Sequence, residues 1–93
     1  MRRELYPSAA FARSLKRIGK KDRPLLAAIR STLMILQENA FDPRLGSHKL
    51  KGELAGFWAC SAAYDVRIIF EITKRDDDEV ILLASVGTHD EVY

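Results

Sequence analysis

The sequence has few cysteines and no long apolar run, and these two absences bear on disulfides, membrane spans and signal peptides. It contains one cysteine, Cys60, which excludes an internal disulfide and favours a reducing compartment. No apolar run approaches the roughly 20 residues that span a bilayer, and no apolar stretch follows the basic N-terminus as in a signal peptide. The 93 residues, 47% of them hydrophobic, suit one small domain covering residues 1–93. We therefore expect a cytoplasmic protein with no membrane contact.

The charges are distributed unevenly along the chain. Residues 1–50 carry eleven lysines and arginines against four acids, a net charge of +7. Residues 51–93 carry four against nine, a net charge of −5. A basic half favours a polyanionic partner. The alternative is that these basic side chains only keep the outer faces of the helices in contact with water and bind no partner.

Two helical patterns occur before residue 40. Phe11, Leu15 and Ile18 recur at helical spacing and form one apolar stripe. Asp22 is suited to be an N-cap and Pro24 to an early helical position, so a second helix is expected directly after the first. Its stripe contains Leu25, Leu26, Ile29, Leu33 and Leu36. The short link predicts that the two helices pack as an antiparallel hairpin.

Strand patterns dominate the rest of the chain. Residues 41–56 contain Gly and Pro and predict a loop or a short irregular strand. Three strands are expected at 57–62, 66–72 and 80–86, and Leu5-Tyr6 is a candidate edge strand. Short links make neighbouring strands antiparallel. The sequence therefore predicts an α+β domain with a two-helix hairpin on one face of a small antiparallel sheet and an open second face.

Alternation in the predicted middle strand places one charge on the open face. Val66, Ile68 and Phe70 would point to the core, so Arg67 points the other way. An arginine there can pair with Glu71 or Asp65, which is the simplest interpretation. It can also grip a phosphate with its guanidinium fork.

The two histidines are the candidate proton-transfer groups. His89 follows the last predicted strand, after Gly87, which we expect to form a turn. It is followed by two acids and Tyr93, and it could instead be a structural capping residue. His48 lies in a Gly-flanked loop, where an exposed histidine without function is common. Their separation of 41 positions is not a metal-ligand spacing, so no metal site is expected.

Three segments together resemble the RelE/YafQ group of bacterial toxins from type II toxin–antitoxin pairs. They are Leu50-Lys51-Gly52, the stretch 64–70 (Tyr-Asp-Val-Arg-Ile-Ile-Phe) and the stretch 85–93 (Ser-Val-Gly-Thr-His-Asp-Glu-Val-Tyr). The resemblance implies the RelE-like fold and a metal-free, cofactor-free mRNA endonuclease that acts in the ribosomal A site. The ribose 2′-hydroxyl would attack its own phosphate and leave a 2′,3′-cyclic phosphate. A cognate antitoxin protein would bind the toxin in a heteromeric complex.

The resemblance also implies a set of site residues. Its YafQ-like pattern assigns catalysis to His48, Asp65 and His89, with Tyr93 as the aromatic residue that contacts RNA. Its RelE-like pattern relies on basic side chains, which implies Arg67 in catalysis and Lys49 and Lys51 in RNA binding. From the residues alone, Asp65 could simply make the turn, Tyr93 could anchor the tail, and the two lysines could solvate the loop.

Two positions depart from the YafQ-like pattern. Ser61 stands where a third histidine is expected, and Ser85 where an arginine is expected. Arg67 could replace the lost positive charge, whereas nothing obvious replaces the histidine. Two alternatives therefore stay open: a ParE-like toxin that poisons DNA gyrase without cleaving RNA, and an inactive relative that only binds antitoxin.

Overall fold

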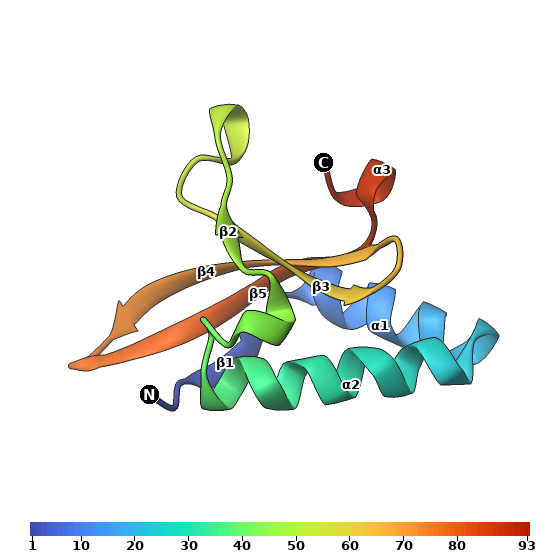
Figure 1. Cartoon of the computed structure of the whole chain (residues 1–93), viewed down its shortest axis with the longest axis horizontal. Coiled ribbons are helices and arrows are strands. Elements are labelled where there is room, and N and C mark those ends of the chain that lie inside the picture. Colours follow the sequence, from blue (N-terminus) through green and yellow to red (C-terminus); the bar gives the residue numbers. More distant parts are fainter.

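Five strands form one sheet, and two long helices cover one of its faces (Figure 1). The computed structural model describes all residues, 1–93. The strands are β1 (Glu4–Pro7), β2 (His48–Lys49), β3 (Trp58–Ala63), β4 (Val66–Arg75) and β5 (Asp78–Thr88). The helices are α1 (Ala9–Lys21), α2 (Arg23–Glu38) and the short α3 (His89–Val92), with single 3₁₀ turns η1 (Pro43–Leu45) and η2 (Gly52–Leu54). No helix is both long enough and apolar enough to span a bilayer.

The two long helices begin where their caps predict. The Ser8 hydroxyl oxygen accepts a hydrogen bond from the Phe11 backbone N–H at 3.0 Å and so caps α1. The Asp22 carboxylate accepts from the Leu25 N–H at 3.0 Å and caps α2, while Pro24 occupies the first turn. The predicted order of two helices joined at Asp22 is thus confirmed.

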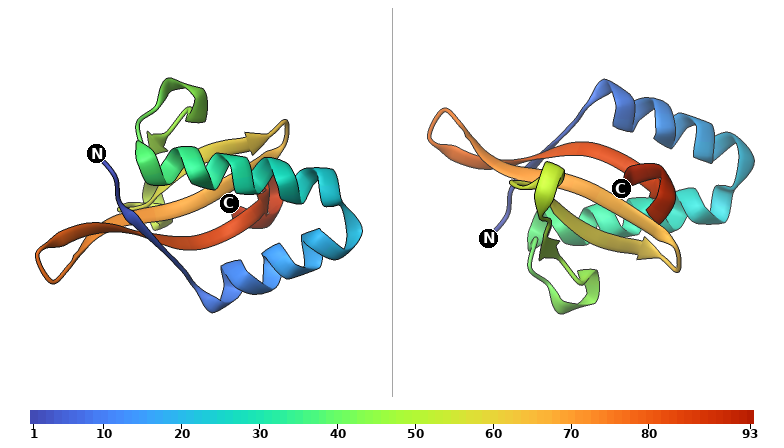
Figure 2. Two further views of the ribbon diagram at one scale, coloured as in Figure 1. Left: turned by 90° about the horizontal axis from the view of Figure 1, so that it is seen from below. Right: turned by 90° about the horizontal axis from the view of Figure 1, so that it is seen from above.

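The helices form a more open pair than a tightly packed hairpin. Asp22 alone links them, and from this link they diverge across the sheet, as both views of Figure 2 show. α1 packs mainly on β5 and α2 on β3. Because the helices separate, a groove remains between them over the sheet.

The sheet is mixed, so the expectation of a purely antiparallel sheet is wrong. The strand order is β1-β5-β4-β3-β2, and β1 pairs with β5 in parallel, with Leu5 opposite Ile81. All other neighbouring strands, from β2 to β5, pair antiparallel as the sequence predicted. The chain leaves β1 through both long helices and re-enters the sheet at β2, on the far edge and in the direction opposite to β1. Three antiparallel pairings, β2–β3, β3–β4 and β4–β5, then bring β5 beside β1 in the same direction. Leu5 and Tyr6 do lie in an edge strand, as the sequence suggested.

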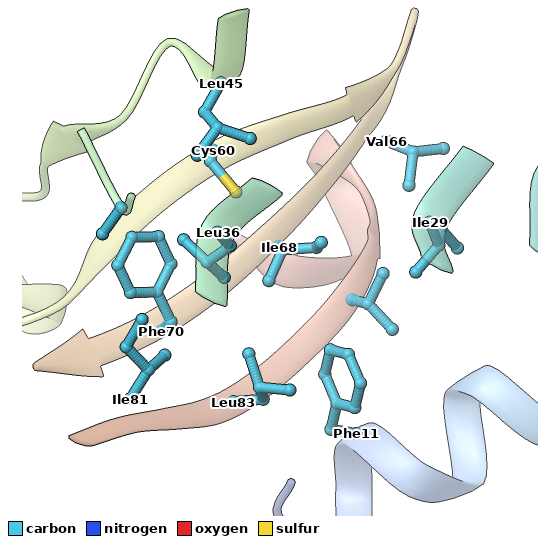
Figure 3. Packing of buried hydrophobic residues seen from close by; sticks show 12 residues of the cluster. Phe11, Ile29, Leu36, Leu45, Cys60, Val66, Ile68, Phe70, Ile81 and Leu83 are labelled. Carbon is cyan, nitrogen blue, oxygen red and sulfur yellow. The ribbon is translucent and has the colours of Figure 1, made fainter. Parts of the chain in front are cut away.

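The core fills the space between the sheet and the two long helices (Figure 3). Phe11, Leu36, Ile68 and Phe70 are at most 1% exposed. The predicted inward side of the middle strand is therefore confirmed. Cys60 also points into this core, and burial raises the pKa of its thiol to about 12, so the thiol stays protonated.

The second face of the sheet is covered in part. Ala59 and Ile69, direct partners in the β3–β4 ladder, are buried but lie outside the main core. The segment containing η2 and the helix α3 both rise on this side, away from α1 and α2 (Figure 1). The sheet surface between them forms the floor of a hollow.

Candidate functional site

An open hollow of about 420 Å³ lies on the face of the sheet that the long helices leave free. Its lining residues are His48, Leu50, Arg67, His89 and Tyr93. Four of these five were singled out from the sequence. Segments from three parts of the chain, the loop around β2, strand β4 and helix α3, thus meet at one place.

Strand register explains why these side chains share a face. Arg67 lies directly opposite Ser61 on one side and Gly87 on the other. His48 lies opposite Ala59, which in turn lies opposite Ile69. Directly opposed residues point to the same side of a sheet, and side chains alternate along each strand. His48 and Arg67 therefore both point away from the helical layer.

The guanidinium of Arg67 has no acidic partner. Its Nη1 donates to three backbone carbonyls, those of Ala63, Tyr64 and Val66, at 3.3, 3.4 and 3.2 Å. No carboxylate lies within 4.0 Å, so the pairing with Glu71 or Asp65 that the sequence allowed does not occur. Nε and Nη2 donate no hydrogen bond within the protein. A half-buried cation with free donors is suited to bind an anionic group.

Helix α3 brings His89 and Tyr93 together. The Tyr93 backbone N–H donates to the His89 carbonyl at 3.0 Å, and the two ring centroids lie 4.4 Å apart. Burial raises the pKa of the Tyr93 phenol, while the nearby Arg67 guanidinium acts in the opposite direction. The phenol is therefore neutral at physiological pH and lies within electrostatic reach of Arg67.

This helix is a feature that the sequence interpretation missed. Gly87 was expected to form a turn, but it is a buried residue of β5, and the strand continues through Thr88. The detectable signal was the spacing of Thr88 and Glu91, because Thr-x-x-Glu is a capping box that starts a helix.

His48 has a defined tautomer. Its Nδ1 lies 3.1 Å from the carbonyl oxygen of Gly46. A carbonyl oxygen only accepts hydrogen bonds, so Nδ1 carries the proton and Nε2 of the neutral ring is an acceptor. Gly46 adopts φ 61°, a left-handed conformation that suits glycine and ends η1 just before His48. An imidazole with a free Nε2 can accept a proton from a bound hydroxyl.

The other predicted site residues lie outside the hollow. Lys49 is opposite Trp58 and points to the helical side, where its Nζ lies 5.5 Å from the centroid of the Trp58 ring. Asp65 is exposed in the turn between β3 and β4, and Lys51 is exposed just before η2. Leu50 also lines the hollow, although it was not among the predicted site residues.

A second concave surface lies on the opposite side of the molecule. It is the groove between α1 and α2, about 620 Å³ in volume, with an apolar floor that includes Leu5, Phe11 and Leu83. Four cations without acidic partners border it, namely Lys16, Lys20, Arg23 and Arg30.

Comparison with known proteins agrees with this architecture. The profile of the family described as "Bacterial toxin of type II toxin-antitoxin system, YafQ" matches residues 3–93. None of the curated protein sequences matches this chain.

Solved structures share the fold at low sequence identity. A YoeB/ParE toxin from Agrobacterium tumefaciens superimposes with a TM-score of 0.80 at 14% identity, covering 92% of this chain and 98% of that one. A histidine-to-glutamine variant of YafQ from E. coli gives 0.79 at 17% identity, with 99% of each chain covered. The E. coli DinJ–YafQ complex gives 0.78 at 18% identity, with the same coverage.

Fold and matches together define a RelE-like toxin of a type II toxin–antitoxin system. Within that class, this chain belongs to the YafQ family. The likeness extends over 92–99% of this chain, and the hollow between β2, β4 and α3 is the candidate active site.

Proposed function

We propose that this toxin is a metal-independent mRNA endonuclease that uses the hollow between β2, β4 and α3. The observation that carries the proposal is that Arg67, a cation without an acidic partner, shares this hollow with both histidines of the chain. A cation and two imidazoles are the groups needed to cleave a phosphodiester by internal attack of the 2′-hydroxyl.

Each group has a distinct task in this reaction. His48 accepts the 2′-hydroxyl proton through Nε2, since its Nδ1 is held by the Gly46 carbonyl. Arg67 donates Nε–H and Nη2–H to the five-coordinate phosphate and stabilises its extra negative charge. His89, with 62% of its side chain exposed, protonates the leaving 5′-oxygen. The products are a 2′,3′-cyclic phosphate and a 5′-hydroxyl.

Tyr93 supplies a surface for a base. Tyr93 is 43% exposed, its ring lies beside His89, and aromatic rings commonly stack on unpaired RNA bases. Lys51 and Asp65 lie farther out and would act on flanking nucleotides or on the orientation of the loop and turn. Lys49 contributes only to the general positive potential, because its side chain points to the other face.

The proposed substrate is mRNA in the ribosomal A site, which implies a cytoplasmic location. The solvent-open hollow suits an extended, unpaired strand better than an enclosed small molecule. It also suits a substrate whose position is fixed by a larger assembly, because the site has few side chains to fix it.

A cognate antitoxin is the proposed protein partner. The groove between α1 and α2 has an apolar floor and a basic border, so it fits an amphipathic segment with acidic residues flanking its apolar stripe. A solved structure of E. coli YafQ with DinJ is a toxin–antitoxin complex. Because the groove and the hollow lie on opposite faces of the sheet, variants of the hollow are expected to retain antitoxin binding.

Expression of His89→Ala in growing cells tests the catalytic proposal. The variant is expected to stop inhibiting growth because proton transfer to the leaving oxygen is lost. Both this variant and the unmodified protein are expected to copurify with the antitoxin, and retained copurification would show that the variant folds. Full toxicity of His89→Ala would remove this residue from the mechanism.

A further inference from the structure

Helix α3 is too short to be stable by itself. It has four residues, and an isolated helix of this length does not form in water. It nevertheless carries two of the side chains that line the hollow, His89 and Tyr93. Contacts within this segment and with β5 must therefore hold it in place.

Glu91 makes the most direct of these contacts. Its carboxylate oxygen Oε1 accepts a hydrogen bond from the Thr88 backbone N–H at 2.8 Å. In return, the Thr88 hydroxyl oxygen accepts from the backbone N–H of Glu91, which completes a reciprocal capping box. The box fixes the direction in which the chain leaves β5, immediately before His89.

The glycine at position 87 makes room for this carboxylate. A Cβ atom placed on Gly87 would lie 2.8 Å from Oε1 of Glu91 and 3.2 Å from its Cβ. Glu91 therefore lies against the β5 backbone at the residue that pairs with Arg67. The Thr88 hydrogen bonds, and to a smaller extent Arg17 of α1, lower the pKa of Glu91 and keep it ionised.

We propose that Glu91 is a positioning residue that holds His89 and Tyr93 over Arg67 by winding α3 onto the end of β5. Glu91 does not line the hollow and takes no part in proton transfer. Its consequence for catalysis rests on the proposed nuclease function, whereas its effect on the placement of His89 does not. Any side chain that accepts the same hydrogen bond would serve, so glutamine can replace it and alanine cannot.

The test compares Glu91→Ala with Glu91→Gln and with a matched control, Asp77→Ala. Asp77 is exposed in the turn of the β4–β5 hairpin, and this hairpin ends far from α3 (Figure 1). Asp77→Ala therefore removes one negative charge, as Glu91→Ala does, but leaves the capping box intact. The first readout is the proton NMR shift of the His89 ring in the RNA-free protein, because the Tyr93 ring 4.4 Å away displaces it.

In Glu91→Ala this ring-current displacement is expected to disappear, and kcat for message cleavage to fall by about tenfold to a hundredfold with KM changed less. Glu91→Gln and Asp77→Ala are expected to keep the His89 ring shift and the kcat of the unmodified protein. Thr88→Ala, which removes the hydroxyl partner of the box, should reproduce part of the loss and serves as a second variant if Glu91→Ala folds poorly.

Two results would overturn the proposal: an unchanged His89 shift in Glu91→Ala, or an equal loss in Glu91→Gln, which would make charge rather than capping the cause. If the unmodified protein cleaves no message, the nuclease proposal fails, and the NMR shift alone then decides the role of Glu91.

Discussion

Arg67 of β4 and Gly87 of β5 are direct partners in the antiparallel ladder, and His89 follows Gly87 by two residues. This register places the Arg67 guanidinium and the His89 imidazole in the same hollow. Because position 87 lacks a side chain, α3 can fold back closely over the end of β5. The pairing of Arg67 with Gly87 is thus the relationship that builds the hollow.

Removing Arg67 is expected to affect activity far more than removing Lys49. Arg67→Ala should lower kcat for message cleavage by about a hundredfold to a thousandfold, because one fixed donor pair to the developing phosphate charge is lost. Lys49→Ala should change kcat little and cost about 0.5–1 kcal/mol of stability through its contact with Trp58. Single-turnover cleavage assays and urea unfolding measure these effects. Similar, small losses in both variants would indicate diffuse electrostatics instead of a phosphate grip.

The titration of Tyr93 reports the proximity of Arg67. The pKa of Tyr93 is raised above its ordinary value of about 10 by burial, and Arg67 partly offsets that effect. Arg67→Ala should therefore raise the Tyr93 pKa further, whereas Lys49→Ala should not. An NMR titration with ¹³C-labelled tyrosine can resolve Tyr93 from the other two tyrosines.

The raised pKa also has a consequence for stability. Because the folded state disfavours tyrosinate, the contribution of Tyr93 to stability is complete below pH 10 and is lost as pH rises through its folded pKa. In the NMR titration of Arg67→Ala described above, a Tyr93 pKa that stays constant or falls would show that the guanidinium is not beside the phenol.

Phe70 should be among the most costly residues to truncate. It is fully buried at the centre of β4 and stacks on Trp58 with ring centroids 6.5 Å apart. Phe70→Ala is expected to lower the free energy of unfolding by about 3–5 kcal/mol through lost burial and the cavity left behind. Leu82→Ala, at a position 36% exposed on the neighbouring strand, is the control and should cost much less. Equal costs in urea unfolding would contradict the placement of the core.

Arg3 ties the N-terminus to the sheet. Its side chain is 9% exposed, and its Nε and Nη2 donate to the same Glu79 carboxylate oxygen at 3.1 and 2.9 Å. Arg3→Ala should cost about 1.5–3 kcal/mol, the usual range for hydrogen bonds to a charged group. A double-mutant cycle with Glu79→Ala should show a coupling energy of at least about 0.5 kcal/mol. Strict additivity of the two single losses would mean that the pair contributes nothing.

Local patterns were sufficient to predict most of the fold. The caps at Ser8 and Asp22, and the alternation along 66–70, act between near neighbours, and the structure confirms the helices and the inward face they predicted. The parallel pairing of β1 with β5 joins residues about 76 positions apart, such as Leu5 and Ile81. No local pattern carries that information, because it depends on how the two helices return the chain to the sheet.

The candidate site was predicted less completely. His48, Arg67, His89 and Tyr93 do meet in one hollow, whereas Lys49 lies on the opposite face. The side of the sheet on which Lys49 falls depends on the register of a two-residue strand with Trp58, and a shift of one residue would reverse it. Ser61, at the position where the resemblance led us to expect a third histidine, lies opposite Arg67 but does not line the hollow.

The most direct test of the central claim is to map the ends of a message after incubation on programmed ribosomes with the purified toxin. We expect new breaks within A-site codons, each with a 2′,3′-cyclic phosphate upstream and a 5′-hydroxyl downstream, and none with His89→Ala. An intact message, together with gyrase-dependent double-strand breaks in DNA, would contradict it.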